Sequence, residues 1–112
     1  MGDEEDLRAA RTEALFRDVN ERIAESAERF GSHDASFVCE CDAADCTHRV
    51  RATLEEYEEV RAHGARFLVA EGHANGDVER VIERRRGFDL VEKIKPLVRN
   101  TVRRLDPRTS NA

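Results

Sequence analysis

The chain has 112 residues, of which 39% are apolar and 38% are charged, and its formal net charge is −5. This length suits one small domain, and no apolar run reaches the roughly 18 residues that a membrane-spanning helix needs. The acidic start of the sequence lacks the basic and apolar regions of a signal peptide, so we expect a cytoplasmic protein. A core of this size without tryptophan is thin, and a bound metal would help to stabilise it.

The charge is divided unevenly along the chain. Residues 1–46 carry 13 acidic and 5 basic side chains, whereas residues 47–112 carry 11 acidic and 14 basic ones. Opposite net charges favour contact between the two parts, either within one chain or across a dimer.

The first predicted element is a long helix from about Asp6 to Phe30, followed by Gly31, a residue suited to the position just after a helix end. Its apolar residues recur mostly at steps of three and four, which predicts one buried face: Leu7, Leu15, Phe16, Val19, Ile23, Ala27 and Phe30. Polar residues such as Arg17 and Asn20 are expected on the other face. Packing on the chain's own sheet is the simpler interpretation. A homodimer through this N-terminal helix is the alternative, because four residues fit a short coiled-coil seam: Phe16, Val19, Ile23 and Phe30.

The middle of the chain predicts two short strands and a short helix. Ser36–Cys41 and Arg49–Ala52 have the composition and alternation of strands. Thr53 followed by Glu56 forms a capping box, which predicts a helix over Leu54–Ala62.

The second half predicts a buried strand, a hairpin and a final helix. Arg66–Ala70 is apolar enough for a buried strand. Val78–Ile82 and Phe88–Ile94 favour strands of a β-hairpin that turns near Arg85–Gly87. Pro96 suits the first turn of the last helix.

These elements together predict one α+β domain over residues 1–112. It comprises a long N-terminal helix, a small antiparallel sheet with a zinc knuckle, a short middle helix and a C-terminal helix. Residues 1–5 and 108–112 are expected to fray.

All three cysteines of the chain lie within eight residues, at Cys39, Cys41 and Cys46. An odd number of cysteines in a cytoplasmic protein argues against a disulfide framework. Cys39 and Cys41 point to the same side of an extended segment, and the four residues after Cys41 allow the chain to reverse and return Cys46. This spacing predicts a metal knuckle, with Zn²⁺ as the expected ion.

A tetrahedral zinc site needs a fourth ligand, and four histidines are candidates. His48 is the nearest, but a site completed by it would hold only one loop. His73 follows the predicted strand Arg66–Ala70 and would tie the knuckle to the second half of the domain, so we favour it. His63 is expected to cap a helix end, and His33 to lie in a loop.

Several stretches form a layout that extends over nearly the whole chain: Glu13–Ile23, Phe37–Cys41 with Cys46, Leu54–Arg61, Arg66–Val69 with Gly72 and His73, Val78–Val81, Val91–Lys93, and Asp106–Arg108. In this layout the chain resembles a family of small proteins from actinobacteria and related high-GC bacteria. The resemblance implies a metal site of three cysteines and the Gly-His histidine, which supports His73 over His48. It also implies strands between Val78 and Lys93, and it implies no activity.

The expected function is that of a non-enzymatic zinc protein. Four protein ligands leave no open position on the metal, so the predicted zinc is structural. Glu40 and Glu71 flank the ligands, but we expect both to be solvated rather than catalytic. We therefore expect a regulatory or adaptor protein that acts through protein–protein contacts.

Two alternatives stay open at this stage. A nucleic-acid-binding zinc protein would use a basic hairpin tip at Arg84–Arg86 and a basic C-terminal stretch: Lys93, Lys95, Arg99, Arg103, Arg104 and Arg108. The acidic chain and the lack of an aromatic stacking surface argue against it. A redox-sensitive zinc-thiolate switch is the minor alternative, since oxidation of the cysteines would release the metal.

Overall fold

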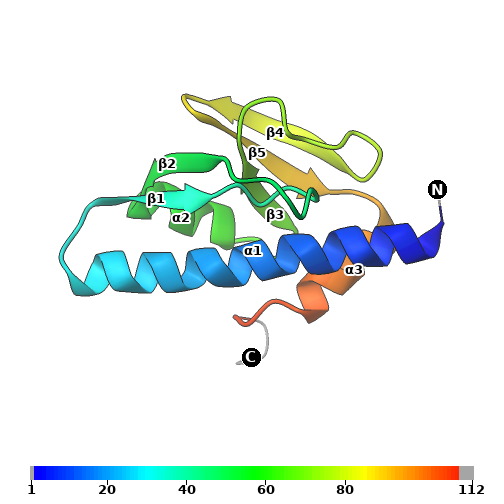
Figure 1. Cartoon of the computed structure of the whole chain (residues 1–112), viewed down its shortest axis with the longest axis horizontal. Coiled ribbons are helices and arrows are strands. Elements are labelled where there is room, and N and C mark those ends of the chain that lie inside the picture. The colour runs from blue at the N-terminus through cyan, green and yellow to red at the C-terminus, as the bar shows by residue number, and fades with distance from the viewer. Residues whose placement is uncertain (1, 109–112) are drawn as a thin grey trace.

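The computed structural model describes residues 2–108, and within them the chain forms the α+β fold expected from the sequence (Figure 1). Three helices and five strands follow one another in this order: α1 (Asp3–Arg29), β1 (Asp34–Val38), β2 (Arg49–Thr53), α2 (Leu54–Arg61), β3 (Arg66–Val69), β4 (Glu79–Arg85), β5 (Phe88–Lys93) and α3 (Pro96–Arg104). Helix α1 runs along the length of the molecule, with the strands above it and α3 and the segment that follows α3 below it in the view of Figure 1.

The strands form two separate antiparallel sheets rather than one. Strands β1 and β2 make a two-stranded sheet in which Phe37 faces Val50. Strands β3, β5 and β4 make a three-stranded sheet with β5 in the centre. The hairpin between β4 and β5 is confirmed, and its turn contains Gly87 at a φ of +91°, a conformation that favours glycine. The loop that contains the cysteines belongs to the first sheet and the turn that contains His73 follows a strand of the second, so contact between these two segments connects the sheets.

Local sequence signals place most element ends correctly. Thr53 and Glu56 form the predicted capping box at the start of α2. Gly31 follows α1 at a φ of +73°, as expected for a residue just beyond a helix end. Helix α1 begins at Asp3, inside the stretch expected to fray, and Arg108 at the other end is held by hydrogen bonds described below. Residues 1 and 109–112, also expected to fray, lie outside the described residues.

The face of α1 that packs against the rest of the chain is not the apolar face predicted from the sequence. Six buried residues line the observed face: Asp6, Ala10, Glu13, Ala14, Arg17 and Asn20. Leu15 and Phe30, predicted to be buried, are 61% and 79% exposed. The prediction is wrong because it assumed that only apolar side chains would be buried. Polar side chains can also be buried wherever other elements supply their hydrogen-bond partners, and the periodicity of the sequence does not show where that happens.

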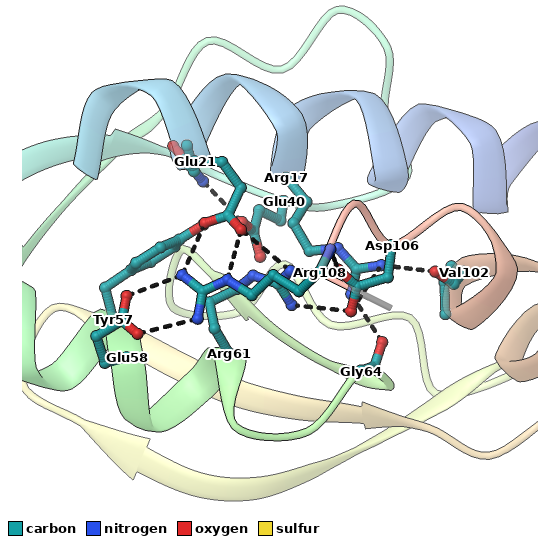
Figure 2. Close-up of polar contacts among 11 residues, drawn as sticks. Arg17, Glu21, Glu40, Tyr57, Glu58, Arg61, Gly64, Val102, Asp106 and Arg108 are labelled. Atoms are coloured by element: carbon teal, nitrogen blue, oxygen red, sulfur yellow. Dashed lines mark hydrogen bonds and ion pairs between the residues drawn. The ribbon is translucent and has the colours of Figure 1, made fainter. Parts of the chain in front are cut away.

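Arginine side chains connect α1 to the end of the chain (Figure 2). The Arg17 guanidinium is buried and donates hydrogen bonds to the carbonyl oxygens of Gly64 (2.7 Å) and Val102 (2.6 Å). Its plane also lies over the Phe67 ring, 4.3 Å from the ring centre. Arg17 thus satisfies backbone carbonyls from two other segments while it packs on the core.

A second group of ion pairs joins α1 and α2 to the segment after α3 (Figure 2). Arg61 of α2 donates to Asp106 at 2.5 Å, and both side chains are buried. Arg108 donates to both carboxylate oxygens of Glu21 (2.6 and 3.0 Å) and of Glu58 (2.9 and 2.8 Å). Burial is the largest influence on Asp106 and opposes its ionisation, but the hydrogen bonds from Arg61 and the Arg108 amide together with the charges of Arg17 and Arg61 outweigh it, so the pKa of Asp106 is lowered.

Lys93, expected on a basic surface, is fully buried at the end of β5. Its ammonium group forms ion pairs with Glu13 of α1 and Glu79 of β4, and it lies 4.9 Å from the centre of the Phe67 ring. Because a buried lysine needs a counter-charge, these two carboxylates make its burial possible. The C-terminal basic stretch therefore loses one of its predicted surface charges.

Candidate metal centre

The three cysteines lie in the loop that connects β1 to β2. The Cys39 amide donates to the His48 carbonyl at 3.1 Å, which continues the pairing of the two strands for one more residue. The Cys46 amide donates to the Ala43 carbonyl at 3.0 Å and closes a tight turn. This turn is the chain reversal expected from the spacing, and it brings Cys46 back beside Cys39 and Cys41.

His73 reaches the same place from the other sheet. It follows β3 through a turn in which Gly72 has a φ of +80° and the His73 amide donates to the Ala70 carbonyl at 3.0 Å. A side chain at position 72 would strain this conformation, so the turn that aims His73 depends on glycine. The Ala70 amide also donates to the Cys39 sulfur at 3.1 Å, which joins the two segments directly.

One potential ligand atom from each of Cys39, Cys41, Cys46 and His73 lies within 4.8 Å of the others, so the four residues could hold a metal ion. The Nδ1 atom of His73 is 3.6 Å from the Cys39 sulfur and 3.7 Å from the Cys46 sulfur. Bond lengths of about 2.3 Å to sulfur and 2.0–2.1 Å to nitrogen place the corners of a zinc tetrahedron about 3.6 Å apart. The two nitrogen–sulfur separations match that spacing.

Burial affects the protonation of the cysteines. Cys39 and Cys41 are buried, and Cys46 and His73 are half-buried. Burial raises the pKa of the Cys39 and Cys41 thiols above the ordinary value, because a thiolate loses its hydration there. A metal ion supplies the positive charge that three neighbouring thiolates need.

The other histidines lie outside the four-residue group. His48, the nearest candidate in sequence, is exposed, and its ring packs edge-on against His73 with the ring centres 4.4 Å apart. His33 and His63 are exposed as well. Among the described residues, the group with metal-binding geometry contains His73 alone of the four histidines.

Glu40, expected to be solvated, is fully buried between the two sheets and α1. Its carboxylate accepts hydrogen bonds from the Leu68 amide (3.0 Å) and from the Asn20 side-chain amide (2.8 Å), and its own amide donates to the Leu68 carbonyl (3.0 Å). The correction has a simple cause. Cys39 and Cys41 face the metal position, so the residue between them points the opposite way, into the protein. Burial raises the pKa of Glu40 to about 7.

Asn20 is a residue that sequence reasoning missed. Its side-chain amide exchanges two hydrogen bonds with the backbone of Val38, one to the carbonyl (2.9 Å) and one from the amide (2.8 Å). It thereby completes the pairing of β1 at the point where the strand enters the cysteine loop. The only available signal was an asparagine on a helix face, which does not show which backbone it pairs with. Glu71, the other glutamate near the ligands, is exposed as expected.

The basic residues of the second half are largely paired with acidic side chains. Lys95 bonds to Asp6, Arg84 to Asp89, and Arg85 to Glu59. In addition, Lys93 is buried, and Arg108 is paired with Glu21 and Glu58. The predicted basic stretch is therefore interrupted and partly neutralised.

No protein-family model matches the chain, and comparisons with curated proteins and with solved structures give no match either. Within residues 2–108, no helix is both long and apolar enough to cross a membrane.

Proposed function

We propose that this protein is a non-enzymatic zinc protein of the cytoplasm, in which Cys39, Cys41, Cys46 and His73 bind one structural Zn²⁺. The observation that supports the proposal is the convergence of four protein ligand atoms within 4.8 Å of one another. Three thiolates and one imidazole suit zinc better than hard cations such as Mg²⁺ or Ca²⁺, which prefer oxygen ligands. Four protein ligands fill a tetrahedron and leave no position for a substrate or an activated water.

The role proposed for the metal follows from where its ligands lie. Three ligands belong to the loop between β1 and β2, and the fourth follows β3 of the other sheet. A metal at this point would fasten the two sheets together, so its binding energy would become folding energy. A small regulatory or adaptor protein, which acts through protein–protein contacts, needs only this stable scaffold and an exposed surface.

Metal analysis of the purified protein tests the proposal. We expect about one zinc per chain, and removal by a chelator should lower the melting temperature sharply. His73→Ala should lose the metal, whereas His48→Ala, a matched change in the neighbouring ring, should keep it. A metal-free protein with an unchanged melting temperature, or equal metal loss in both variants, would refute the assignment.

The nucleic-acid alternative has less support than the protein-contact function. Its C-terminal basic stretch is broken by the buried Lys93 and by the clamped Arg108. A gel-shift titration with generic DNA and RNA at low salt measures it directly, because phosphate binding is strongest there. A salt-dependent shift would replace the protein-contact function with nucleic-acid binding.

A further inference from the structure

Helix α1 carries a stripe of seven residues on the side away from its buried face, and one of them, Ile23, lies at the edge where the helix still packs against the core. None of the seven is buried in the structure: Arg8, Thr12, Leu15, Val19, Ile23, Ser26 and Phe30. We refer to them as the outer stripe. Two of its apolar residues are strongly exposed, Leu15 at 61% and Phe30 at 79%, and Val19 is 38% exposed. Large apolar side chains arranged in a line along a helix mark an interaction surface.

The spacing of the outer stripe is symmetric about Val19. Reading from Arg8 to Phe30, successive members are separated by four, three, four, four, three and four residues. Arg8 and Phe30 each lie eleven residues from Val19, which is about three helical turns, or about 16 Å, in either direction. Because an eleven-residue step returns to almost the same side of a helix, Arg8, Val19 and Phe30 lie nearly in line, and the other four positions lie within about 40° of that line, evenly to both sides.

The chemistry of the outer stripe is symmetric as well. Leu15 and Ile23 are aliphatic residues on either side of Val19, and Thr12 and Ser26 are hydroxyl residues farther out. The outermost pair consists of Arg8 at one end and Phe30 at the other. A guanidinium and an aromatic ring attract each other, so the two ends complement one another.

We propose that the outer stripe is the interface of an antiparallel homodimer, with Val19 on the two-fold axis. Such an interface uses the same surface on both copies, and a stripe that reads the same in both directions is self-complementary. Leu15 would then pack against the partner subunit's Ile23, and Thr12 would meet the partner subunit's Ser26. This inference goes beyond the zinc site and does not depend on whether the cysteine loop holds a metal.

A depression on the surface of α1 lies where it could receive the exposed Phe30 ring of a second copy. A shallow depression of about 320 Å³ lies beside the start of the outer stripe and is lined by Glu4, Arg8, Arg11, Thr12 and Leu15. It is centred about as far before Val19 as Phe30 lies after it. In the antiparallel arrangement, each Phe30 ring therefore reaches the depression on the other copy, where Arg8 can lie against the ring.

Charge selects the antiparallel over the parallel arrangement. A parallel pair would place Arg8 beside the partner subunit's Arg8 and Phe30 beside the partner subunit's Phe30. The antiparallel pair also brings the acidic first turn of one helix, Asp3–Asp6, towards Arg29 in the last turn of the other. Opposite helix ends and opposite charges then lie side by side.

Sedimentation or light scattering over a range of concentrations tests the dimer. We expect a reversible dimer, and Val19→Asp should weaken it by about 100-fold or more, because two carboxylates would meet on the axis. Leu105→Asp is the matched control, since Leu105 is 40% exposed and lies outside α1. This control should dimerise like the native protein. A native monomer at every concentration, or an unaltered dimer in Val19→Asp, would overturn the proposal.

A pair of Phe30 variants tests the orientation. Phe30→Glu and Phe30→Arg remove the same ring, but in the antiparallel dimer only the glutamate would meet an opposite charge, at the partner subunit's Arg8. We expect Phe30→Glu to dimerise at least about 10-fold more tightly than Phe30→Arg. Arginine is the better residue for a helix C-terminus, so this order cannot arise from helix stability. Equal weakening of both variants would contradict the antiparallel arrangement.

Discussion

Replacement of Glu13 by glutamine should flatten the pH dependence of stability. Glu13 lies on the buried face of α1, where its carboxylate bonds to Lys93 through one oxygen while the other oxygen has no hydrogen-bond partner. The nearby charges are Lys93, which favours the carboxylate, and Glu79 and Asp42, which oppose it. Burial is the largest influence, and it raises the pKa of Glu13 from 4.5 to about 7.

The magnitude and the sign follow from this shift. A carboxyl group whose pKa is higher in the folded state than in the unfolded state binds its proton more tightly when folded. Its contribution to stability is therefore fully present below the unfolded value of 4.5 and is lost as the pH rises through about 7. A shift of this size corresponds to about 3 kcal/mol between pH 4 and pH 8. Glutamine has no proton to lose, and Lys93 keeps Glu79 as a partner in the variant.

The measurement is urea unfolding of the native protein and Glu13→Gln at a series of pH values. The difference between their free energies of unfolding reports Glu13 together with its effect on its neighbours Lys93 and Glu79, because the more distant titrating groups are common to both proteins. Relative to the native protein, the variant should become more stable by about 3 kcal/mol as the pH rises from 4 to 8. Glu25→Gln, at an exposed position on the same helix, controls for the change in net charge. A difference that stays constant across this range would refute the reasoning.

Two further substitutions test contacts that hold α1 and the segment after α3 in place. Asp106→Ala removes a carboxylate that the buried Arg61 and Arg17 share, and it leaves Glu21 as the partner of Arg61. It should lower the free energy of unfolding by about 3–5 kcal/mol, measured in urea; a loss below about 1 kcal/mol would show that Glu21 and water compensate for the lost carboxylate. Asn20→Ala removes both hydrogen bonds to the Val38 backbone and should cost about 1–3 kcal/mol. In that variant the Val38 amide should exchange its hydrogen faster, whereas unchanged protection of this amide would show that Asn20 does not anchor β1.

The candidate metal centre and the buried charges serve related purposes in this small fold. The core contains few large apolar side chains, with Phe37 stacked on Tyr57 and Phe67 packed beneath Arg17 and Lys93. Polar links therefore join elements that apolar packing alone would hold weakly. Glu40 illustrates the connection, because it sits between two candidate ligands and bonds to α1 and β3 at the same time.

The sequence by itself determined the elements and the grouping of the candidate ligands. Local rules placed the capping box at Thr53, the end of α1 before Gly31, and the β4–β5 hairpin at Gly87. These features depend on backbone conformation and on neighbours a few residues away, which a sequence displays directly. The selection of His73 over His48 also came from the sequence, since only the former lies beyond a strand that could bring a distant ligand to the knuckle.

Only the tertiary structure decided which face of α1 is buried and what the charged residues do. Arg17, Asn20 and Glu13 are buried because Val102, Val38 and Lys93, far away in the chain, supply their partners. The polarity of a side chain alone does not show whether the residue is exposed. A hydrogen bond or an ion pair can offset the loss of water on burial, and the partners that provide it are known only from the tertiary structure. Four of the apolar residues that the periodicity assigned to the buried face, Leu15, Val19, Ile23 and Phe30, belong to the outer stripe instead, with Ile23 at the edge of the core.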